Sequence, residues 1–391
     1  MIRYDAIVVG AGPAGSALAA GLAGDGARVL LLEQAHHPRP KACAEYASPM
    51  IAEELARIGI PETGWSDDAV ALTGMHIHAG RHVARITYAD RRGARTAWGL
   101  DRRRFDSRLA NHAAACGAEV REGSRAVGLI DEGGRIGGVR IRDTGRGDER
   151  TIQADWVVGA DGARSSVARL LGVERPVRFP RRLGLIAHYR GDPTLTDHGE
   201  MHVGRGWYVG LAPTPSRELN VGMALPMTAG APSAASRFAS AIDGLPAVAR
   251  RLAHSQRLGP IRGASPIGHR VSDVAGPGWL LIGDAAGFVD PFTGEGIHRA
   301  LRSARAAANA LRADGDVAAA YRRERRQAFA AKSTLSWLVQ AFLAVPPLLE
   351  HAVARLEARP LAALRLGSSL GDCRPATAAL APSALIELLR P

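Results

Sequence analysis

The chain has 391 residues, of which 46% are hydrophobic and 23% charged, enough for two or three domains of an ordinary soluble type. Its net charge is +12, and nearly all of its positively charged residues are arginine. No compact basic run is interleaved with aromatic residues, so nucleic-acid binding is not expected. No apolar stretch reaches the ~18 residues of a membrane span and no signal peptide opens the chain, which favours a cytoplasmic location.

The N-terminus predicts a strand, a glycine-rich turn, a helix and a second strand. Apolar residues 4–9 and 28–32 have the length of buried strands, and the small residues 16–23 between them are typical of a closely packed helix. The turn and the end of the second strand contain Gly10, Gly12, Pro13, Ala14, Gly15, Glu33 and Gln34.

Each part of this unit has a task in binding a dinucleotide. The first glycine permits a tight turn, the second lets the backbone approach a pyrophosphate, and the third lets the helix pack on the strand. The N–H groups that begin the helix favour a phosphate. Glu33 is placed to accept hydrogen bonds from ribose hydroxyls and would repel a 2′-phosphate, so the resident dinucleotide is expected to be FAD or NAD rather than NADP.

Two further strands end in glycine-flanked aspartates. Residues 156–160 lead into Asp161 and Gly162, and residues 279–282 lead into Gly283 and Asp284. Such an aspartate can reach a ligand hydroxyl, or it can simply cap a turn. Gly294, Gly296 and Ile297 then open an alanine-rich helix that is expected to run to about residue 311.

This order of segments resembles the flavoproteins with the p-hydroxybenzoate hydroxylase fold, over residues 1 to about 330. The resemblance implies that the cofactor is FAD and that Asp161 braces its site. It also implies that Gly283 and Asp284 bind the ribityl chain and pyrophosphate, that Arg102 contacts FAD, and that the strand containing Val127 lies beside the adenine.

A closer resemblance is to the geranylgeranyl reductase superfamily. It is carried by Lys41-Ala42-Cys43 with Ser48-Pro49, by Gly206-Trp207-Tyr208 with Asn220-Val221-Gly222, and by the whole segment 283–297, in which Gly287 stands where aromatic hydroxylases usually have histidine. The chain departs from the family pattern at Ala44-Glu45-Tyr46, where glycines are usual, and at Arg205, where tyrosine is usual. Both departures are expected to lie near the substrate.

The resemblance also suggests residues for the chemistry. It places Cys43 beside the flavin or substrate, where it could donate a proton, tune the ring or only fill space. Glu45 and Tyr46 could supply a proton or serve packing. Trp207, Tyr208 and Phe292 are expected at the substrate. If the turn at Gly294–Ile297 lies against the isoalloxazine, its N–H groups would favour negative charge at N1 and O2. No second dinucleotide motif is present, so NAD(P)H would bind transiently, or another donor would serve.

No metal site is expected. His76 and His78 share one face of a likely strand, but no partner ligands follow at metal spacing, and the three cysteines are scattered.

The fold class is α/β (α+β), with a discontinuous Rossmann-type FAD-binding domain over residues 1–72, 96–180 and 268–330. Residues 73–95 and 181–267 are expected to form an inserted, mostly antiparallel sheet that covers the flavin and binds substrate. In the C-terminal segment, residues 331–391, one apolar helix face precedes a break at Pro346 and Pro347; it could pack on the cofactor domain or form a lid or peripheral membrane contact.

The sequence therefore predicts an FAD-dependent oxidoreductase that reduces or oxidises a carbon–carbon bond of a small hydrophobic, isoprenoid- or polyketide-like substrate. The alternative is a monooxygenase, a hydroxylase or epoxidase, that uses NAD(P)H and O2 on an aromatic or polyketide substrate. A non-catalytic redox sensor is disfavoured because no signalling module accompanies the motifs. The pattern indicates no oligomeric state.

Overall fold

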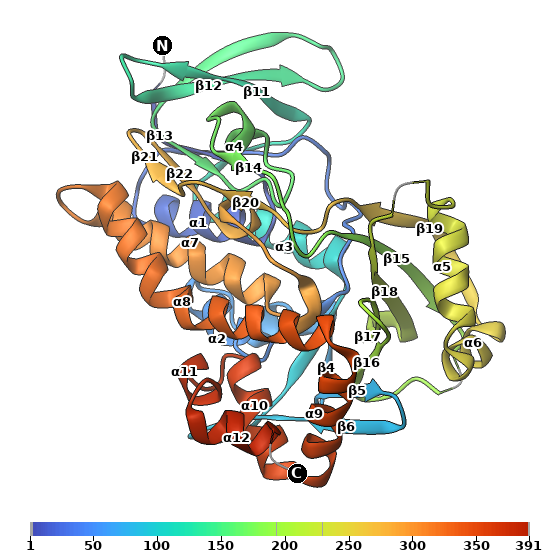
Figure 1. Ribbon diagram of the computed structural model, residues 1–391. Coiled ribbons are helices and arrows are strands. Elements are labelled where there is room, and N and C mark those ends of the chain that lie inside the picture. The colour runs from blue at the N-terminus through green and yellow to red at the C-terminus, as the bar shows by residue number, and fades with distance from the viewer. Residues whose placement is uncertain (1–2, 193, 229, 390–391) are drawn as a thin grey trace.

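The computed structural model describes residues 3–192, 194–228 and 230–389, which form a mixed α/β fold built on two main sheets (Figure 1). The first sheet has eight strands in the order β10-β2-β1-β13-β12-β11, with β22 paired to β13 and β21 to β22. Its strands are β1 (Arg3–Val9), β2 (Val29–Leu32), β10 (Glu119–Arg121), β11 (Ser124–Asp131), β12 (Ile136–Asp143), β13 (Glu149–Gly159), β21 (Ala275–Gly276) and β22 (Trp279–Leu281).

In the first sheet, β10, β2, β1, β13 and β22 are parallel, and β11 and β12 form an antiparallel extension. One face is covered by helices that share a hydrophobic core with β1 and β2. These helices are α1 (Pro13–Gly24), α2 (Ile51–Arg57), α3 (Arg102–Ala115) and α7 (Gly296–Arg312), while α4 (Ser166–Leu170) lies on the other face. The predicted strand–turn–helix–strand unit is thereby confirmed.

The second sheet has seven strands in the order β19-β15-β18-β17-β16-β5-β6, all antiparallel to their neighbours except the parallel pair β16–β5. Its strands are β5 (Met75–Ala79), β6 (His82–Ile86), β15 (Arg182–Arg190), β16 (Gly199–Val203), β17 (Tyr208–Thr214), β18 (Glu218–Pro226) and β19 (Gln256–Ala264). The helices α5 (Ala234–Asp243) and α6 (Pro246–Ala253) cover its outer face.

Smaller strands link these bodies. They are β3 (Tyr46–Ala47), β4 (Ala69–Leu72) and β9 (Ala97–Leu100) in one sheet, β7 (Tyr88–Asp90) with β8 (Gly93–Arg95), and β14 (Glu174–Arg175) with β20 (Arg270–Val271). The strands of the second sheet come from the two ranges predicted for the inserted domain, and the domain boundaries themselves stay a prediction.

From residue 317 to residue 389 the chain is helical. The helices of this segment are α8 (Val317–Ala344), α9 (Pro346–Ala358), α10 (Pro360–Leu370), α11 (Ala376–Ala379) and α12 (Pro382–Leu389). The break falls at Pro346, because proline lacks the N–H that would continue the helix, and α8 and α9 meet at 114°. Within the described residues no single helix is long and apolar enough to cross a membrane, and only the bent pair α8–α9 has sufficient length and apolar composition together.

A buried charge cluster joins α8 and the C-terminal helices to the start of α7. The ammonium of Lys332 lies 3.1 Å from Glu295 Oε2 and 3.1 Å from Asp372 Oδ1, and His298 Nδ1 lies 2.9 Å from Asp372. Burial alone would lower the pKa of Lys332, but the two carboxylates raise it. All four side chains are at most 10% exposed, so each charge depends on the others for compensation.

We predict that Lys332→Met lowers the free energy of unfolding by about 3–5 kcal/mol, because two buried carboxylates lose their shared cation. Urea unfolding followed by circular dichroism measures this. Arg365→Ala, which breaks an exposed pair with Glu387, is the control and should change stability by less than about 1 kcal/mol. Equal, small effects of the two variants would contradict the importance of the cluster.

Candidate active site

The glycine turn after β1 is closed by contacts that only glycine allows. Gly10 has a φ of +107°, and a Cβ there would lie 2.6 Å from the carbonyl oxygen of Ala160. A Cβ at Gly15 would lie 1.9 Å from the carbonyl oxygen of Gly10. At Gly12, by contrast, the nearest atom to such a Cβ would be Arg39 Nη2 at 3.8 Å, so the backbone of Gly12 borders open space.

The same turn begins α1 with its N–H groups available. Gly12 is the N-cap, no side chain caps the helix, and Pro13 supplies the fixed φ that suits a first turn. An uncapped helix N-terminus beside open space is suited to a phosphate. The Lys41 ammonium lies near Gly162 and acts electrostatically on Asp284, so a cation is also close to this region.

Glu33 ends β2 as predicted, and its carboxylate is buried. Oε2 accepts a hydrogen bond from the Ala11 N–H at 3.2 Å, and Oε1 accepts one from the Ala35 N–H at 3.1 Å. Arg39 Nη2 lies 3.0 Å from Oε2, a partner that the sequence pattern did not indicate. Gln34 is exposed, and Val127 is half-buried on β11. The Ser124 N–H donates to the Glu33 carbonyl, which brings the start of β11 beside the end of β2.

The two glycine-flanked aspartates have different environments. Asp161 accepts hydrogen bonds from the side chains of Ser165 and Ser166 and from the N–H of Ser166, so it caps α4 and braces the loop that contacts Gly10. The Asp284 carboxyl has no hydrogen-bond partner among the described residues, and burial raises its pKa. A partly buried carboxyl without a donor is suited to ligand hydroxyls.

The turn before α7 also borders open space. Gly294 adopts the left-handed conformation with φ +67°, no side chain caps α7, and a Cβ at Gly296 would meet no atom within 4 Å. Ile297 is buried beneath this turn. The free N–H groups and positive end of a 17-residue helix therefore face a space that can accept a partly negative ring edge.

Cys43, Glu45 and Arg102 meet beside this turn. Arg102 Nη1 donates to Cys43 Sγ at 3.2 Å, while its Nε and Nη2 donate to the two oxygens of Asp106 at 2.8 and 2.9 Å. The Arg102 N–H donates to Glu45 Oε1 at 3.3 Å. Arg102 is thus buried, and protein groups accept three of its five guanidinium N–H donors, which leaves two for a ligand.

Two residues that the sequence did not single out complete the cluster. His188 Nε2 on β15 lies 2.7 Å from Glu45 Oε2, and Asn220 Nδ2 on β18 donates to the same oxygen and to the Cys43 carbonyl, both at 2.9 Å. The hydrogen bond that His188 forms with the Glu45 carboxylate raises the pKa of His188 above its ordinary value. His188 and Asn220 are paired in register across the second sheet, a contact that no local pattern predicts.

Tyr46 lies next to Gly294, but its hydroxyl is 2.8 Å from that of Tyr88, and burial raises the pKa of Tyr46 well above the ordinary value.

Tyr208 donates a hydrogen bond to Asp290 Oδ1 at 2.6 Å, and its ring meets Phe292 edge to face with the ring centroids 5.1 Å apart. Trp207 does not join them. It packs against the hydrophobic cluster on the outer face of the second sheet.

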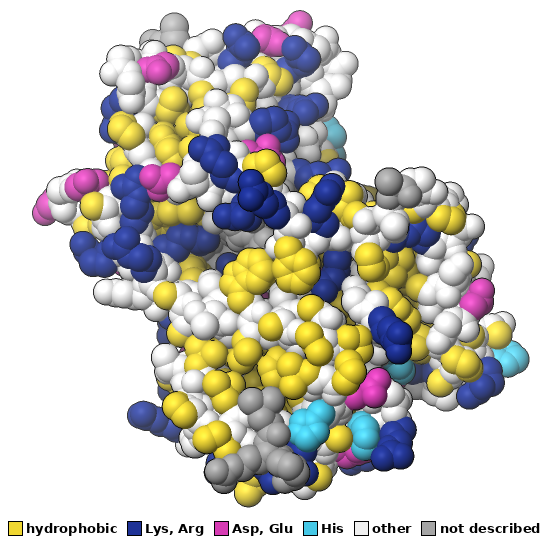
Figure 2. All heavy atoms as spheres, viewed as in Figure 1, with side chains coloured by type: hydrophobic (Ala, Val, Ile, Leu, Met, Phe, Trp, Pro, Cys, Tyr) yellow, Lys and Arg dark blue, Asp and Glu magenta, His cyan; other side chains and the backbone are white. Residues whose placement is uncertain are grey.

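A cavity of about 620 Å³ borders Gly287 and Phe288, just after the Asp284 turn. Its lining includes Arg270, Arg299, Arg322, Arg325 and Arg326. Figure 2 shows basic side chains gathered on this face beside an area of hydrophobic ones. The exposed rings of Phe179 and Trp337 lie at the cavity, with their centroids 6.5 Å apart. The positive charge of these arginines favours binding of a molecule that carries phosphate groups.

These features fit FAD. Open space lies at the N-terminus of α1, a partly buried carboxyl without a donor follows β22, and the uncapped start of α7 faces a second open space. The fold and the site therefore define an FAD-dependent oxidoreductase.

The comparisons support this class. A family model described as an FAD binding domain matches residues 3–196. The menaquinone reductase of Mycolicibacterium smegmatis is 33% identical over 80% of this chain and 77% of its own. The digeranylgeranylglycerophospholipid reductase of Methanocella arvoryzae is 32% identical over 81% of this chain and 80% of its own. The chain belongs to this family, the geranylgeranyl reductase superfamily of FAD-dependent oxidoreductases.

Solved structures share the fold. A geranylgeranyl bacteriochlorophyll reductase-like protein from Thermoplasma acidophilum has a TM-score of 0.81 at 24% identity, covering 99% of this chain and 96% of its own. A flavin-dependent brominase also has a TM-score of 0.81, at 20% identity over 99% of both chains. Because one fold holds both reductases and halogenases, the activity has to be argued from the site.

We predict that Gly12→Ala folds but binds FAD at least about tenfold more weakly, since its Cβ fits the protein yet enters the space beside the helix N-terminus. FAD released per chain and the far-ultraviolet circular dichroism are measured together. Gly24→Ala at the other end of α1 is the matched control, because a Cβ there meets nothing within 4 Å. Full FAD content in Gly12→Ala would show that the pyrophosphate does not lie there.

Proposed function

We propose that this protein reduces carbon–carbon double bonds in the polyisoprenoid chain of a quinone or a lipid. The observation that carries the proposal is the Glu45–His188 pair, because Glu45 directly precedes Tyr46, whose ring contacts Gly294 in the turn before the uncapped start of α7. Reduction of a double bond adds a hydride to one carbon and a proton to the other. Bound FAD, once reduced, supplies the hydride, and the protein has to supply the proton.

His188 is the proposed proton donor. Its hydrogen bond with Glu45 raises its pKa, so a larger share of the imidazole is protonated near neutral pH. Loss of the proton leaves a neutral imidazole that stays bonded to the carboxylate. Asn220 holds Glu45 Oε2 through its amide and thereby fixes the ring position. Tyr46 is a weaker candidate, because its raised pKa makes it a poorer acid.

The substrate class rests on the relatives, whose names refer to menaquinone and to digeranylgeranyl lipids, both of which carry polyisoprenoid chains. The inner face of the second sheet is consistent with a flat, apolar chain. Gly184, Gly210, Gly222 and Ala224 lie across three neighbouring strands on the same face as His188 and Asn220. Tyr208 and Phe292 lie at the end of this face and are proposed to contact the substrate.

We further propose NAD(P)H as the electron donor. The arginine-lined cavity beside Gly287 supports an anionic donor that approaches from this side. The same basic and hydrophobic surface suits a peripheral contact with an anionic membrane, from which a lipid substrate would be drawn.

The activity is tested by incubating the FAD-loaded protein without oxygen, with NADPH or NADH and either a menaquinone or a digeranylgeranyl lipid. We expect products that gain two hydrogen atoms per reduced bond and keep them after exposure to air. A quinone reduced only at its ring would also gain two hydrogens but lose them in air. Products that form only with oxygen and gain one oxygen atom would establish the monooxygenase alternative instead.

A pH profile tests the proton donor. We predict that His188→Gln lowers kcat at least about 100-fold, as expected for loss of a general acid. Glu45→Gln should move the alkaline limb of the kcat profile to lower pH, because without the carboxylate the pKa of His188 falls and the imidazole loses its proton earlier.

Tyr189→Phe is the control for the proton donor, since Tyr189 neighbours His188 on β15 but packs on the outer face. An unmoved alkaline limb in Glu45→Gln, with FAD still bound, would exclude His188 as the group that titrates.

A further inference from the structure

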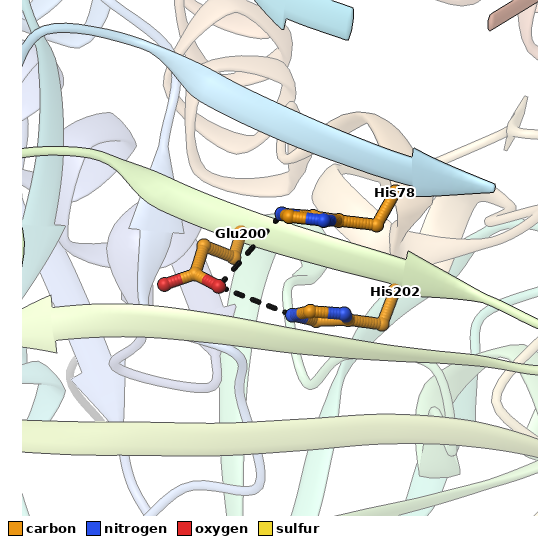
Figure 3. A group of neighbouring side chains, drawn as sticks. All are labelled: His78, Glu200 and His202. Carbon is orange, nitrogen blue, oxygen red and sulfur yellow. Dashed lines mark hydrogen bonds and ion pairs between the residues drawn. The ribbon is translucent and has the colours of Figure 1, made fainter. Parts of the chain in front are cut away.

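The outer face of the second sheet carries a cluster of histidines around one carboxylate, on the side away from the proposed substrate. The parallel strands β5 and β16 place His78 and His202 directly opposite each other, and Glu200 precedes His202 by two residues on the same face. The intervening Ile77 and Met201 point the other way, into the inner hydrophobic cluster. Figure 3 shows both imidazole rings turned toward the same carboxylate oxygen.

The three side chains have the spacing of metal ligands. His202 Nε2 lies 3.1 Å and His78 Nε2 3.8 Å from Glu200 Oε2, and the three atoms lie within 4.8 Å of one another. A tetrahedral zinc ion with bonds of about 2.0–2.2 Å separates its ligand atoms by roughly 3.3–3.6 Å. A shift of each side chain by a few tenths of an ångström therefore brings these distances into the range for a common ion.

The cluster has a buried atom without a partner. Nε2 of His78 is buried and forms no hydrogen bond within the described residues, although it points toward Glu200. The rings of His78 and His202 stack nearly parallel, 13° apart with centroids at 4.2 Å, so both Nε2 atoms lie beside Glu200 and a rotation of one ring would turn both lone pairs toward a shared ion. A buried, unpaired imidazole nitrogen costs free energy unless it is occupied, and a metal ion would occupy it.

The surroundings orient the carboxylate without blocking it. Arg251 on α6 donates to Glu200 Oε1 at 2.5 Å and is itself held by Asp192, which leaves Oε2 for the ion. A cavity of about 730 Å³ opens beside the cluster, lined also by Thr194, Thr196 and His254. This cavity gives room for a water molecule as fourth ligand.

We propose that His78, Glu200 and His202 bind a divalent transition-metal ion of the zinc type. Two imidazoles and one carboxylate suit zinc, whereas magnesium and calcium require oxygen ligands. The ion would join β5, from the first quarter of the chain, to β16, 124 positions later, and so fix this part of the sheet whose inner face borders the proposed substrate site. This inference is independent of the reaction that the flavin site performs.

The test uses untagged, FAD-bound protein that has been treated with EDTA and then dialysed against zinc or, separately, magnesium. Elemental analysis is expected to find about one zinc per chain and no retained magnesium. Zinc, but not magnesium, should raise the melting temperature. Absence of bound zinc in the wild-type protein at micromolar free zinc would overturn the proposal by itself.

Variants identify the ligands. His78→Gln, Glu200→Gln and His202→Gln should each weaken zinc binding at least about tenfold, while FAD content reports that each variant is folded. His76→Gln is the matched control, because His76 lies two residues before His78 on the same face but stacks on His198 outside the group. Retained binding in all three ligand variants, or an equal loss in His76→Gln, would overturn the assignment.

Discussion

The position of the turn before α7 depends on a buried cation, the ammonium group of Lys332. The Lys332 ammonium on α8 lies between Glu295, in that turn, and Asp372, after α10. A few residues earlier, Asp290 binds Arg182 of the second sheet at 2.6 Å and the hydroxyl of Tyr208, and Arg182 also donates to Gln340 of α8. Buried charges tolerate few alternative arrangements, so these contacts fix how the two sheets and the C-terminal helices meet at the candidate active site.

The parts of the site that sequence predicted are those whose requirements are local. Gly10 adopts a positive φ, Gly15 packs against the Gly10 carbonyl, and Asp161 accepts the N–H of a residue only five positions later. His188, by contrast, reaches Glu45 because the register of β15 against β18 and the path of residues 41–47 bring together segments 143 positions apart. No spacing rule contains that information.

One error could have been avoided from the sequence alone. Trp207 and Tyr208 are adjacent in an extended segment, and neighbouring strand residues point to opposite faces, so both could not line one pocket. The structure turns Tyr208 inward and Trp207 outward. The same alternation separates His78 and His202 from Ile77 and Met201, which is why the expectation of no metal ligands, made from linear spacing, overlooked a cluster formed between β5 and β16.

Glu45 adopts φ +59°, a backbone conformation that favours glycine, and the family usually has glycine in this segment. The chain thus keeps a glycine's backbone shape while adding a carboxylate, at a conformational cost of roughly 1 kcal/mol that the three hydrogen bonds to Glu45 can offset. A glycine at this position would leave His188 and Asn220 without a shared partner, whereas here a carboxylate holds both. Replacement of Glu45 by glycine would therefore keep the backbone path but uncouple two strands of the second sheet from the segment that contains Cys43.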